Sequence, residues 1–413
     1  MGSGLFPLDD ELALLPGVLT PWLQASLVRL GAWLPFWRAA RELGWLSRAP
    51  DGRLVSESMA GRLTEAAGGA AVMEQTVAVE RLEQHPTPEP TGPAVLQVSA
   101  DGAMISRGGR QGVEVKTLAL GRVIQEADGT VRATDLSYFS RRAEHTEFRR
   151  LALVETSRRG VGTAKTVVAV MDGAEWLQRF IDFHRSDAIR VLDFPHAVEY
   201  LTRASHEAFG AGTVTTSAWI GTQAHALKHT GPDAVLAALR ALPPGEQRDT
   251  ALGYLTARLA QIAYPTFRAQ GYPIGSGIVE SANKVVVQAR LKGSGMHWAA
   301  AHVDPMLALR TIVCADRWDE AWPQIAARLR ADARARSRTL QAEHRATRAA
   351  ALAASQTPAA PPTPETPPAS HANITPATPR SRPPKTILDG CPTNAHPWKH
   401  RFVPHHPASP ARN

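Results

Sequence analysis

The order of short apolar runs between residues 94 and 196 constrains the fold of this chain more than any other feature. The run at 165–173, KTVVAVMDG, is almost continuously apolar and β-branched, which is typical of a central strand buried on both faces. Three runs with strand-like alternation precede it, and one more follows. The predicted strands lie in 94–106, where the strand ends at Asp101-Gly102, and in 112–124, 134–141, 165–173 and 188–196. The predicted helices between them are 145–159 and 174–184.

Strands and helices that follow one another in this way predict an α/β fold class. Three strands, a helix, a strand, a helix and a strand is also the order of the ribonuclease-H-like (RNase-H-like) fold. Helical patterns separated by Gly and Pro turns then occupy about 196–270, before a later helix. We therefore expect an RNase-H-like catalytic domain at 91–328, interrupted by an all-helical insertion at about 196–270.

The segments on either side of this core have a different composition. Residues 1–90 have apolar residues at helical spacing and end in a proline-rich linker, HPTPEPTGP. Ser56 or Ser58 is placed to cap a short helix, and the spacing suits a DNA-binding helix-turn-helix, although a helical bundle without a DNA role fits equally well. Over 329–413 we expect an Arg/Ala helix followed by a basic, proline-rich, disordered tail.

The charge of the chain is concentrated at its C-terminal end. The formal net charge is +8, and residues from 331 onward hold 11 Lys and Arg against 4 Asp and Glu. Such a tail is suited to contact nucleic acid, although basic tails are also often only solvated. No apolar run reaches the roughly 18 residues that span a bilayer, and no N-terminal signal is present, so we expect a cytoplasmic, nucleoid-associated protein without membrane partners. Cys314 and Cys391 form no CxxC motif, which excludes a disulfide framework and a cysteine-based zinc site.

Two aspartates are candidates for metal-dependent chemistry. Asp101 and Asp172 each end an apolar run and precede a glycine, and strand ends at one edge of an α/β sheet are where ligands bind. With a third carboxylate, they would hold two Mg²⁺ ions about 3.5–4 Å apart. Oxygen ligands suit Mg²⁺, and Mn²⁺ is expected to substitute for it. The alternative is that Asp-Gly is only a common turn signal.

Glu280 is the candidate for the third carboxylate. It is the only acidic residue within 250–303, in the stretch GSGIVESANKVVVQARLKGSGMHW. A surface pair with Lys284 at i+4 is the competing explanation, worth roughly 0.3–0.5 kcal/mol, and it does not exclude a metal role. We expect Glu280 to bind metal while Lys284, Arg290 and Lys292 bind the DNA backbone.

Three further positions are weaker candidates. Asp193 and His196 form a D-x-x-H unit after the last strand, which would organise the site or contact DNA; alternatively Asp193 caps the next helix and His196 packs. Trp298 would stack on a DNA base or anchor the core. His225 and His229 have metal-ligand spacing but no accompanying glutamate, which favours a helical surface pair over zinc.

Four stretches carry a family resemblance: VSADGAMI, VVAVMDGAEWLQ, VLDFPHAVEYL and GYPIGSGIVESANKVVVQARLKGSGMHW. Together they resemble the DDE transposases of bacterial insertion sequences, specifically the ISKra-four family, over roughly residues 5–325. A short stretch in the tail, PTNAHPWKHRF, also resembles this family. The resemblance implies that Asp101, Asp172 and Glu280 are the catalytic triad. It also makes Asp193 and His196 helpers of that triad.

The resemblance implies a transposase that cuts insertion-sequence ends and joins the freed 3′-hydroxyls to target DNA with two metal ions. Its partners would be double-stranded DNA and further copies of the chain assembled on it. Many transposases carry an N-terminal cysteine-rich zinc segment that is not found here, so end recognition would rest on helices alone, or the start is truncated. Two other classes stay open: another RNase-H-like nuclease, such as a structure-selective resolvase, and a catalytically inactive, transposase-derived DNA-binding protein.

Overall fold

The structure is a computed structural model that describes residues 14–15, 19–49, 52–106, 112–293, 296–356, 387–388 and 391–392. The chain forms two compact units, residues 1–346 and residues 347–413. In the second unit, the end of a long helix and one short antiparallel pair of strands, β6 (Ile387–Leu388) and β7 (Cys391–Pro392), are described. The predicted disorder of the tail concerns residues that lie largely outside the described ones.

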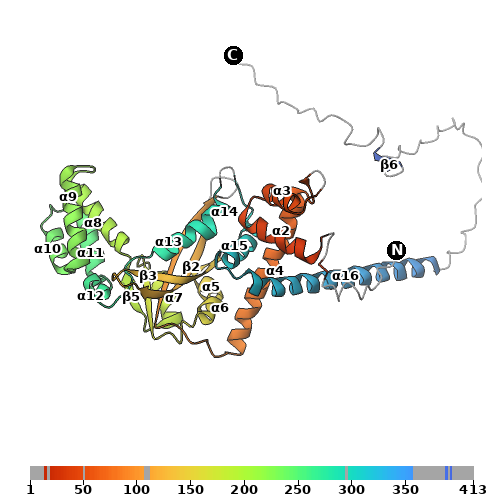
Figure 1. Cartoon of the computed structure of the whole chain (residues 1–413), viewed down its shortest axis with the longest axis horizontal. Helices are drawn as coiled ribbons and strands as arrows, with labels where there is room; N and C mark the ends of the chain where they lie inside the picture. The colour runs from red at the N-terminus through yellow and green to blue at the C-terminus, as the bar shows by residue number, and fades with distance from the viewer. Residues whose placement is uncertain are drawn as a thin grey trace, which may run out of the picture. The chain divides into compact units, whose positions relative to one another are not determined.

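A five-stranded mixed sheet lies at the centre of the first unit (Figure 1). Its order is β3-β2-β1-β4-β5; β1, β2 and β3 are antiparallel neighbours, and β1, β4 and β5 are parallel neighbours. The strands are β1 (Val95–Ser106), β2 (Gly112–Gln125), β3 (Val131–Arg141), β4 (Thr166–Met171) and β5 (Ile189–Leu192). The predicted α/β class and the predicted succession of strands along the chain are therefore confirmed.

Two strand ends differ from their predictions. β1 does not end at Asp101: Gly102 still pairs with Lys116, and Ala103 and Ile105 remain buried, so the alternation of the strand continues. β5 ends at Leu192 instead of continuing to 196, because the next residue caps a helix. Asp101 therefore lies within a strand, and its side chain projects from a face of the sheet.

One face of the sheet is covered by helices from the first half of the chain. Alternate residues of β1 and β4, among them Leu96, Val98 and Ala169, pack there against Phe148, Leu177 and other apolar side chains. The covering helices are α4 (Glu57–Gln84), α5 (His145–Leu151), α6 (Leu153–Arg158) and α7 (Glu175–Arg185). The helix predicted at 145–159 is thus two short helices.

The opposite face is covered by later helices, which pack on residues such as Val168 and Val170 of β4 and Ile105 of β1. Between β5 and residue 270 lie α8 (Phe194–Phe209), α9 (Val214–His229), α10 (Pro232–Arg240), α11 (Glu246–Thr256), η2 (Leu259–Gln261) and α12 (Tyr264–Ala269), so this stretch is helical as predicted. There follow α13 (Gly277–Ala282), the π-helix η3 (Asn283–Gln288), α14 (Ala289–Leu291) and α15 (Ala300–Cys314).

The N-terminal helices belong to the same compact unit as the sheet. They are α2 (Pro21–Trp33), α3 (Phe36–Leu46) and α4, and most of the long α16 (Trp318–Gln356) belongs to this unit as well. Ser56 caps α4 by accepting the Met59 N–H at 3.2 Å, but this helix has 28 residues and is not the short one expected. A Cβ at Gly68 would lie 2.3 Å from the Pro305 carbonyl oxygen, so α4 and α15 approach closely there.

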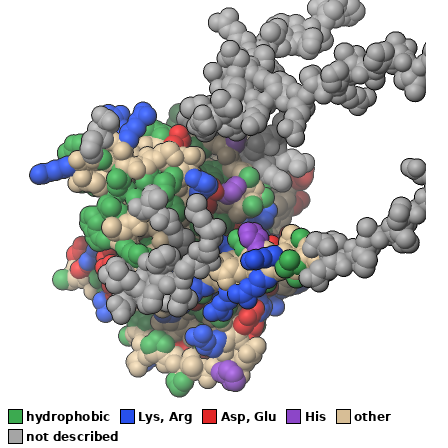
Figure 2. Space-filling model, turned by 90° about the vertical axis from the view of Figure 1, so that its right-hand side faces the viewer, with side chains coloured by type: hydrophobic (Ala, Val, Ile, Leu, Met, Phe, Trp, Pro, Cys, Tyr) green, Lys and Arg blue, Asp and Glu red, His purple; other side chains and the backbone are tan. Residues whose placement is uncertain are grey.

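The N-terminal helices expose several aromatic side chains. Trp22 and Trp45 are 72% and 71% exposed, and Trp37 is 52% exposed. Figure 2 shows this side of the molecule, where exposed hydrophobic side chains lie beside Lys and Arg. Among the described residues, no helix combines the length and the apolar composition needed to cross a bilayer.

Candidate active site

The register of the sheet brings the first two candidate carboxylates together. Leu96 of β1 lies opposite Val167 of β4, an offset of 71 positions (167 − 96), and Asp101 and Asp172 are separated by the same number (172 − 101). Both belong to the alternate residues that face the later helices. The two strands pair as far as Val98 and Ala169, and Asp101 and Asp172 follow these residues by three positions each. The charge of Asp172 acts on Asp101, so the two carboxylates lie near each other on one face of the sheet.

Asp193 follows β5 at the same level. It is 5% exposed, and its two carboxylate oxygens accept different backbone N–H groups: Oδ2 accepts that of His196 at 3.1 Å, and Oδ1 that of Ser276 at 2.7 Å. The first bond caps α8, as the sequence allowed. The second ties the end of β5 to the N-cap of α13, the helix that carries Glu280. Asp193 thus connects the edge of the sheet to the helix of the third carboxylate.

Glu280 lies on the exposed side of α13 and is electrostatically coupled to Asp101. Burial raises the pKa of Asp101, and the negative charges of Asp172 and Glu280 raise it further. The Gly102 N–H at 2.7 Å and the Asn283 side-chain amide at 2.8 Å donate hydrogen bonds to the two carboxylate oxygens of Asp101, and both bonds lower its pKa. The charges of Asp172 and Glu280 therefore both act on Asp101.

The side-chain donors at this face are carboxylate and amide oxygens, the types that a hard divalent cation prefers. Among the described residues, no three acidic, histidine or cysteine side chains converge tightly enough to enclose an ion, so the carboxylates are within electrostatic reach without the short distances of a closed metal site. A cation would relieve the repulsion at Asp101, and carboxylate oxygens are the ligands Mg²⁺ prefers. The side-chain oxygen of Asn283, 5% exposed and beside Asp101, has no hydrogen-bond partner. Asn283 is a site residue that the sequence did not single out.

The α-helix that carries Glu280 becomes a π-helix three residues after Glu280. Asn283 begins the π-helix η3, and π-helical turns occur frequently at functional sites. The guanidinium of Arg310, which is 1% exposed, donates to the carbonyl oxygens of Val285 and Val286 within this turn and, at 3.1 Å, to that of Ala32 in α2. This buried arginine stabilises the irregular turn and joins it to the N-terminal helices.

The basic residues predicted to bind DNA differ in their exposure. Lys284 and Lys292 are exposed, as a phosphate contact requires. Arg290 is only 2% exposed; its Nε donates to the Gly31 carbonyl oxygen at 3.2 Å, and burial lowers its pKa to about 10. The prediction that Arg290 contacts the DNA backbone is therefore wrong for this structure, because the side chain joins α14 to the end of α2.

Trp298 is also a core residue. It is 8% exposed, its ring lies edge-on to Phe36 at 6.3 Å, and the Arg290 guanidinium lies 5.1 Å from its centroid. The predicted stacking on a DNA base is corrected accordingly, and the alternative of a core anchor holds.

The histidine candidates have ordinary packing environments. His196 is half-buried and meets the rings of Tyr200 and Tyr254 edge-on, at 5.4 and 5.9 Å. His225 and His229 stack at 4.4 Å, and the latter lies 3.0 Å from an Arg268 nitrogen. A cation beside this pair is consistent with the surface alternative to zinc.

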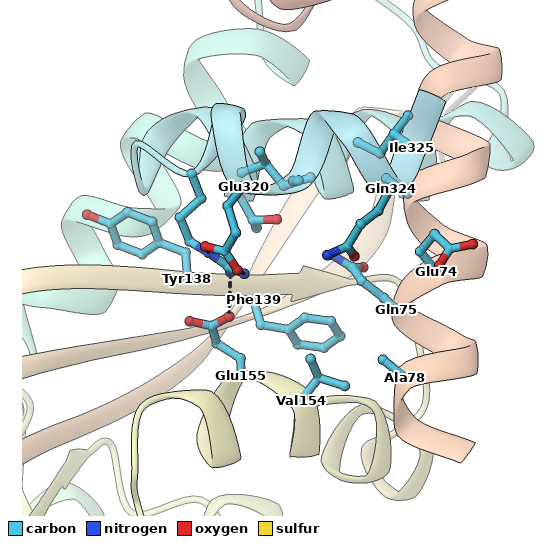
Figure 3. Close-up of a pocket in the computed structure, with 15 residues that line it drawn as sticks. Glu74, Gln75, Ala78, Tyr138, Phe139, Val154, Glu155, Glu320, Gln324 and Ile325 are labelled. Carbon is cyan, nitrogen blue, oxygen red and sulfur yellow. Dashed lines mark hydrogen bonds and ion pairs between the residues drawn. The ribbon is translucent and has the colours of Figure 1, made fainter. Parts of the chain in front are cut away.

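A separate cavity of about 100 Å³ lies between α4, β3, α6 and α16 (Figure 3). Glu155 projects into it and pairs with Arg317 at 3.0 Å, and Arg317 pairs in turn with Glu320. Its charges are matched within the chain, and it is lined by none of the predicted site residues. It is therefore a feature of the packing distinct from the carboxylate site.

Comparison with protein-family models and with curated proteins finds no match to this chain.

Proposed function

We propose that the chain is a DDE-type DNA transposase related to the ISKra-four family. The observation that carries the proposal is the electrostatic coupling of Asp101 to Asp172 and Glu280 across one face of the sheet. The strand order β3-β2-β1-β4-β5, with its change from antiparallel to parallel at β1, supports an RNase-H-like core. In this proposal, the helices from α8 to α12 are an insertion in that core, placed before the helix of the third carboxylate.

In this proposal, Asp101, Asp172 and Glu280 hold Mg²⁺, or Mn²⁺ in its place. When bound, two such ions would supply activation of the attacking hydroxyl group and stabilisation of the leaving oxygen in phosphodiester cleavage and transfer. The hydrogen bonds from Asn283 and Gly102 orient the carboxylate of Asp101.

Other residues hold the helix and the DNA. Asp193 fixes the start of α13 through the Ser276 N–H. The exposed Lys284 and Lys292 follow Glu280 in sequence and bind phosphates of the double-stranded substrate. Transposon ends and target DNA are the proposed partners, bound by several copies of the chain in a bacterial nucleoid.

The test is cleavage of DNA that carries the inverted repeats flanking the gene. Asp101→Asn, Asp172→Asn and Glu280→Gln should each bind this DNA normally and cut it at least about 100-fold more slowly in Mg²⁺, because metal ions contribute several kcal/mol and each 1.36 kcal/mol is tenfold in rate. Asp128→Asn, in the exposed β2–β3 turn, is the matched control and should cut normally. The triad is wrong if one of the three variants cuts at the wild-type rate.

The same assay separates the other classes. Equal cutting of branched DNA without the repeats would indicate a structure-selective nuclease. Specific binding to the repeats without cleavage in Mg²⁺ or Mn²⁺ would indicate a transposase-derived DNA-binding protein.

A further inference from the structure

Helix α11 and the residues after it contact the turn that carries Asp172. The hydroxyl of Tyr254 donates to the Asp172 carbonyl oxygen at 2.5 Å, and Nη2 of Arg258 donates to the Gly173 carbonyl oxygen at 3.1 Å. Two consecutive backbone carbonyls are thus held by side chains 82 and 85 positions away in the chain. The other contact of the turn is local: Oδ1 of Asp172 accepts the Ala174 N–H at 2.8 Å.

The approach of these side chains depends on glycine. Gly173 has a φ of 81°, in the left-handed region that favours glycine. A Cβ there would lie 2.6 Å from the Tyr254 hydroxyl oxygen and 2.9 Å from Nε of Arg258. The backbone conformation of the turn and the position of the two side chains are therefore mutually dependent.

Tyr254 and Arg258 also hold each other in place. The guanidinium carbon of Arg258 lies 3.8 Å from the centre of the Tyr254 ring. The ring of Tyr200 also stacks on Tyr254, at 4.0 Å between ring centres and an interplanar angle of 10°. Burial raises the pKa of Tyr254 to about 12, so its hydroxyl remains a donor at neutral pH. A stacked, part-buried donor pair is a rigid support for a turn.

We propose that Tyr254 and Arg258 are positioning residues that fix the orientation of the Asp172 carboxylate. They make the helical stretch between β5 and α13 a working part of the active site. The inference rests on the proposed function, since it assigns Asp172 a metal-binding role. Supporting residues of this kind change metal affinity or activity about 10- to 100-fold when removed.

The test uses the full chain, with Mn²⁺ alone as the probe. Tyr254→Phe keeps the stacked ring and removes the hydroxyl that donates to the Asp172 carbonyl oxygen. Arg258→Gln removes the positive charge and the guanidinium that donates to the Gly173 carbonyl oxygen. Arg258→Lys keeps a positive charge at this position. Thr256→Ala, exposed on the same helix, is the matched control. Mn²⁺ affinity is measured by calorimetry without DNA, amide exchange is followed at residues 173 and 174 without metal, and cleavage is measured over a range of Mg²⁺ concentrations.

We expect Tyr254→Phe and Arg258→Gln to bind Mn²⁺ about tenfold more weakly, to exchange the two amides faster, and to need more Mg²⁺ for half-maximal cleavage. Arg258→Lys should recover part of each loss, and DNA affinity should not change. Wild-type Mn²⁺ affinity in both variants would overturn the inference, as would faster exchange without any change in affinity. A wild-type chain that binds Mn²⁺ but cuts no DNA would refute the proposed function and leave the affinity comparison decisive for this inference.

Discussion

Asp101 and Asp172 each follow the last paired residues of β1 and β4, Val98 and Ala169, by three positions, because the 71 positions that separate them equal the register offset between these parallel strands. The register therefore brings the two carboxylates to one face of the sheet. Glu280 adds a third negative charge from α13, and the pKa of Asp101 is raised by burial and by both neighbours. In the absence of a cation, this arrangement destabilises the folded chain at neutral pH.

Asp101→Asn should therefore raise the melting temperature of the metal-free protein by a few degrees while it abolishes cleavage. The amide removes the buried charge and keeps an oxygen that accepts a hydrogen bond from Gly102 or Asn283. Mg²⁺ should raise the melting temperature of the wild type, since it binds the folded state, but not that of the variant. Scanning calorimetry with and without Mg²⁺ measures both effects, and Asp128→Asn controls for a simple change of net charge. A lower melting temperature for Asp101→Asn in the absence of metal would contradict this account.

Asp193→Ala should cost more stability than the loss of an ordinary helix cap. It leaves the N–H groups of His196 and Ser276 without their acceptor, at a cost of roughly 2–4 kcal/mol. Thr213→Ala is the matched control, because Thr213 caps α9 by accepting the Thr216 N–H and its other hydrogen bonds are to nearby residues of the α8–α9 turn, and its loss should cost about 1 kcal/mol. Urea unfolding gives both values. Cleavage should fall in the Asp193 variant only, since only Asp193 also holds the helix of Glu280; equal losses in the two variants would show that the Ser276 bond is unimportant.

The sequence was sufficient to predict the sheet and the grouping of the aspartates, because both depend on local patterns. Alternation and β-branched runs specify strands, and each aspartate was predicted at the end of such a run, at one edge of the sheet. The continuation of β1 past Asp101 was missed because Asp-Gly usually marks a turn; here the glycine pairs within the strand opposite Lys116.

The contacts that complete the site were not predictable, because they join residues far apart in sequence. Asn283 reaches Asp101 across 182 positions, and Tyr254 reaches the Asp172 carbonyl across 82. The basic stretch around Arg290 predicts a DNA contact, but tertiary packing places this side chain against Phe36 and Trp298. Nothing in the residues of the π-helix distinguishes it from an ordinary helical turn.

Lys284 and Lys292 should differ from Arg290 in how their loss affects DNA binding. Affinity for DNA falls as salt rises, and each exposed lysine that contacts a phosphate contributes about −0.9 to the slope of log affinity against log salt concentration. Lys284→Ala and Lys292→Ala should therefore each make this negative slope shallower by about that amount. Arg290→Ala should leave the slope unchanged and instead cost roughly 2–4 kcal/mol of stability, because it leaves a cavity and an unpaired Gly31 carbonyl. Binding titrations from 50 to 300 mM salt, paired with urea unfolding, separate the two effects. A reduced slope in a folded Arg290 variant would restore its assignment as a DNA contact.

His184 should make the folded chain less stable in mild acid. It lies partly buried beside Phe180, its Nδ1 lies 3.1 Å from the Thr156 hydroxyl, and desolvation lowers its pKa from 6.5 to about 4. The unfolded chain therefore binds a proton below pH 6.5 that the folded chain does not bind until about pH 4. The contribution of His184 is fully present above pH 6.5 and declines as the pH falls towards 4, by roughly 3 kcal/mol in total at 1.36 kcal/mol per unit. His184→Phe keeps a ring in the cluster and removes the titration. Urea unfolding of both proteins at pH values from 4 to 7.5 should show the wild type losing stability relative to the variant only below pH 6.5, and a constant difference across that range would exclude His184 as the source.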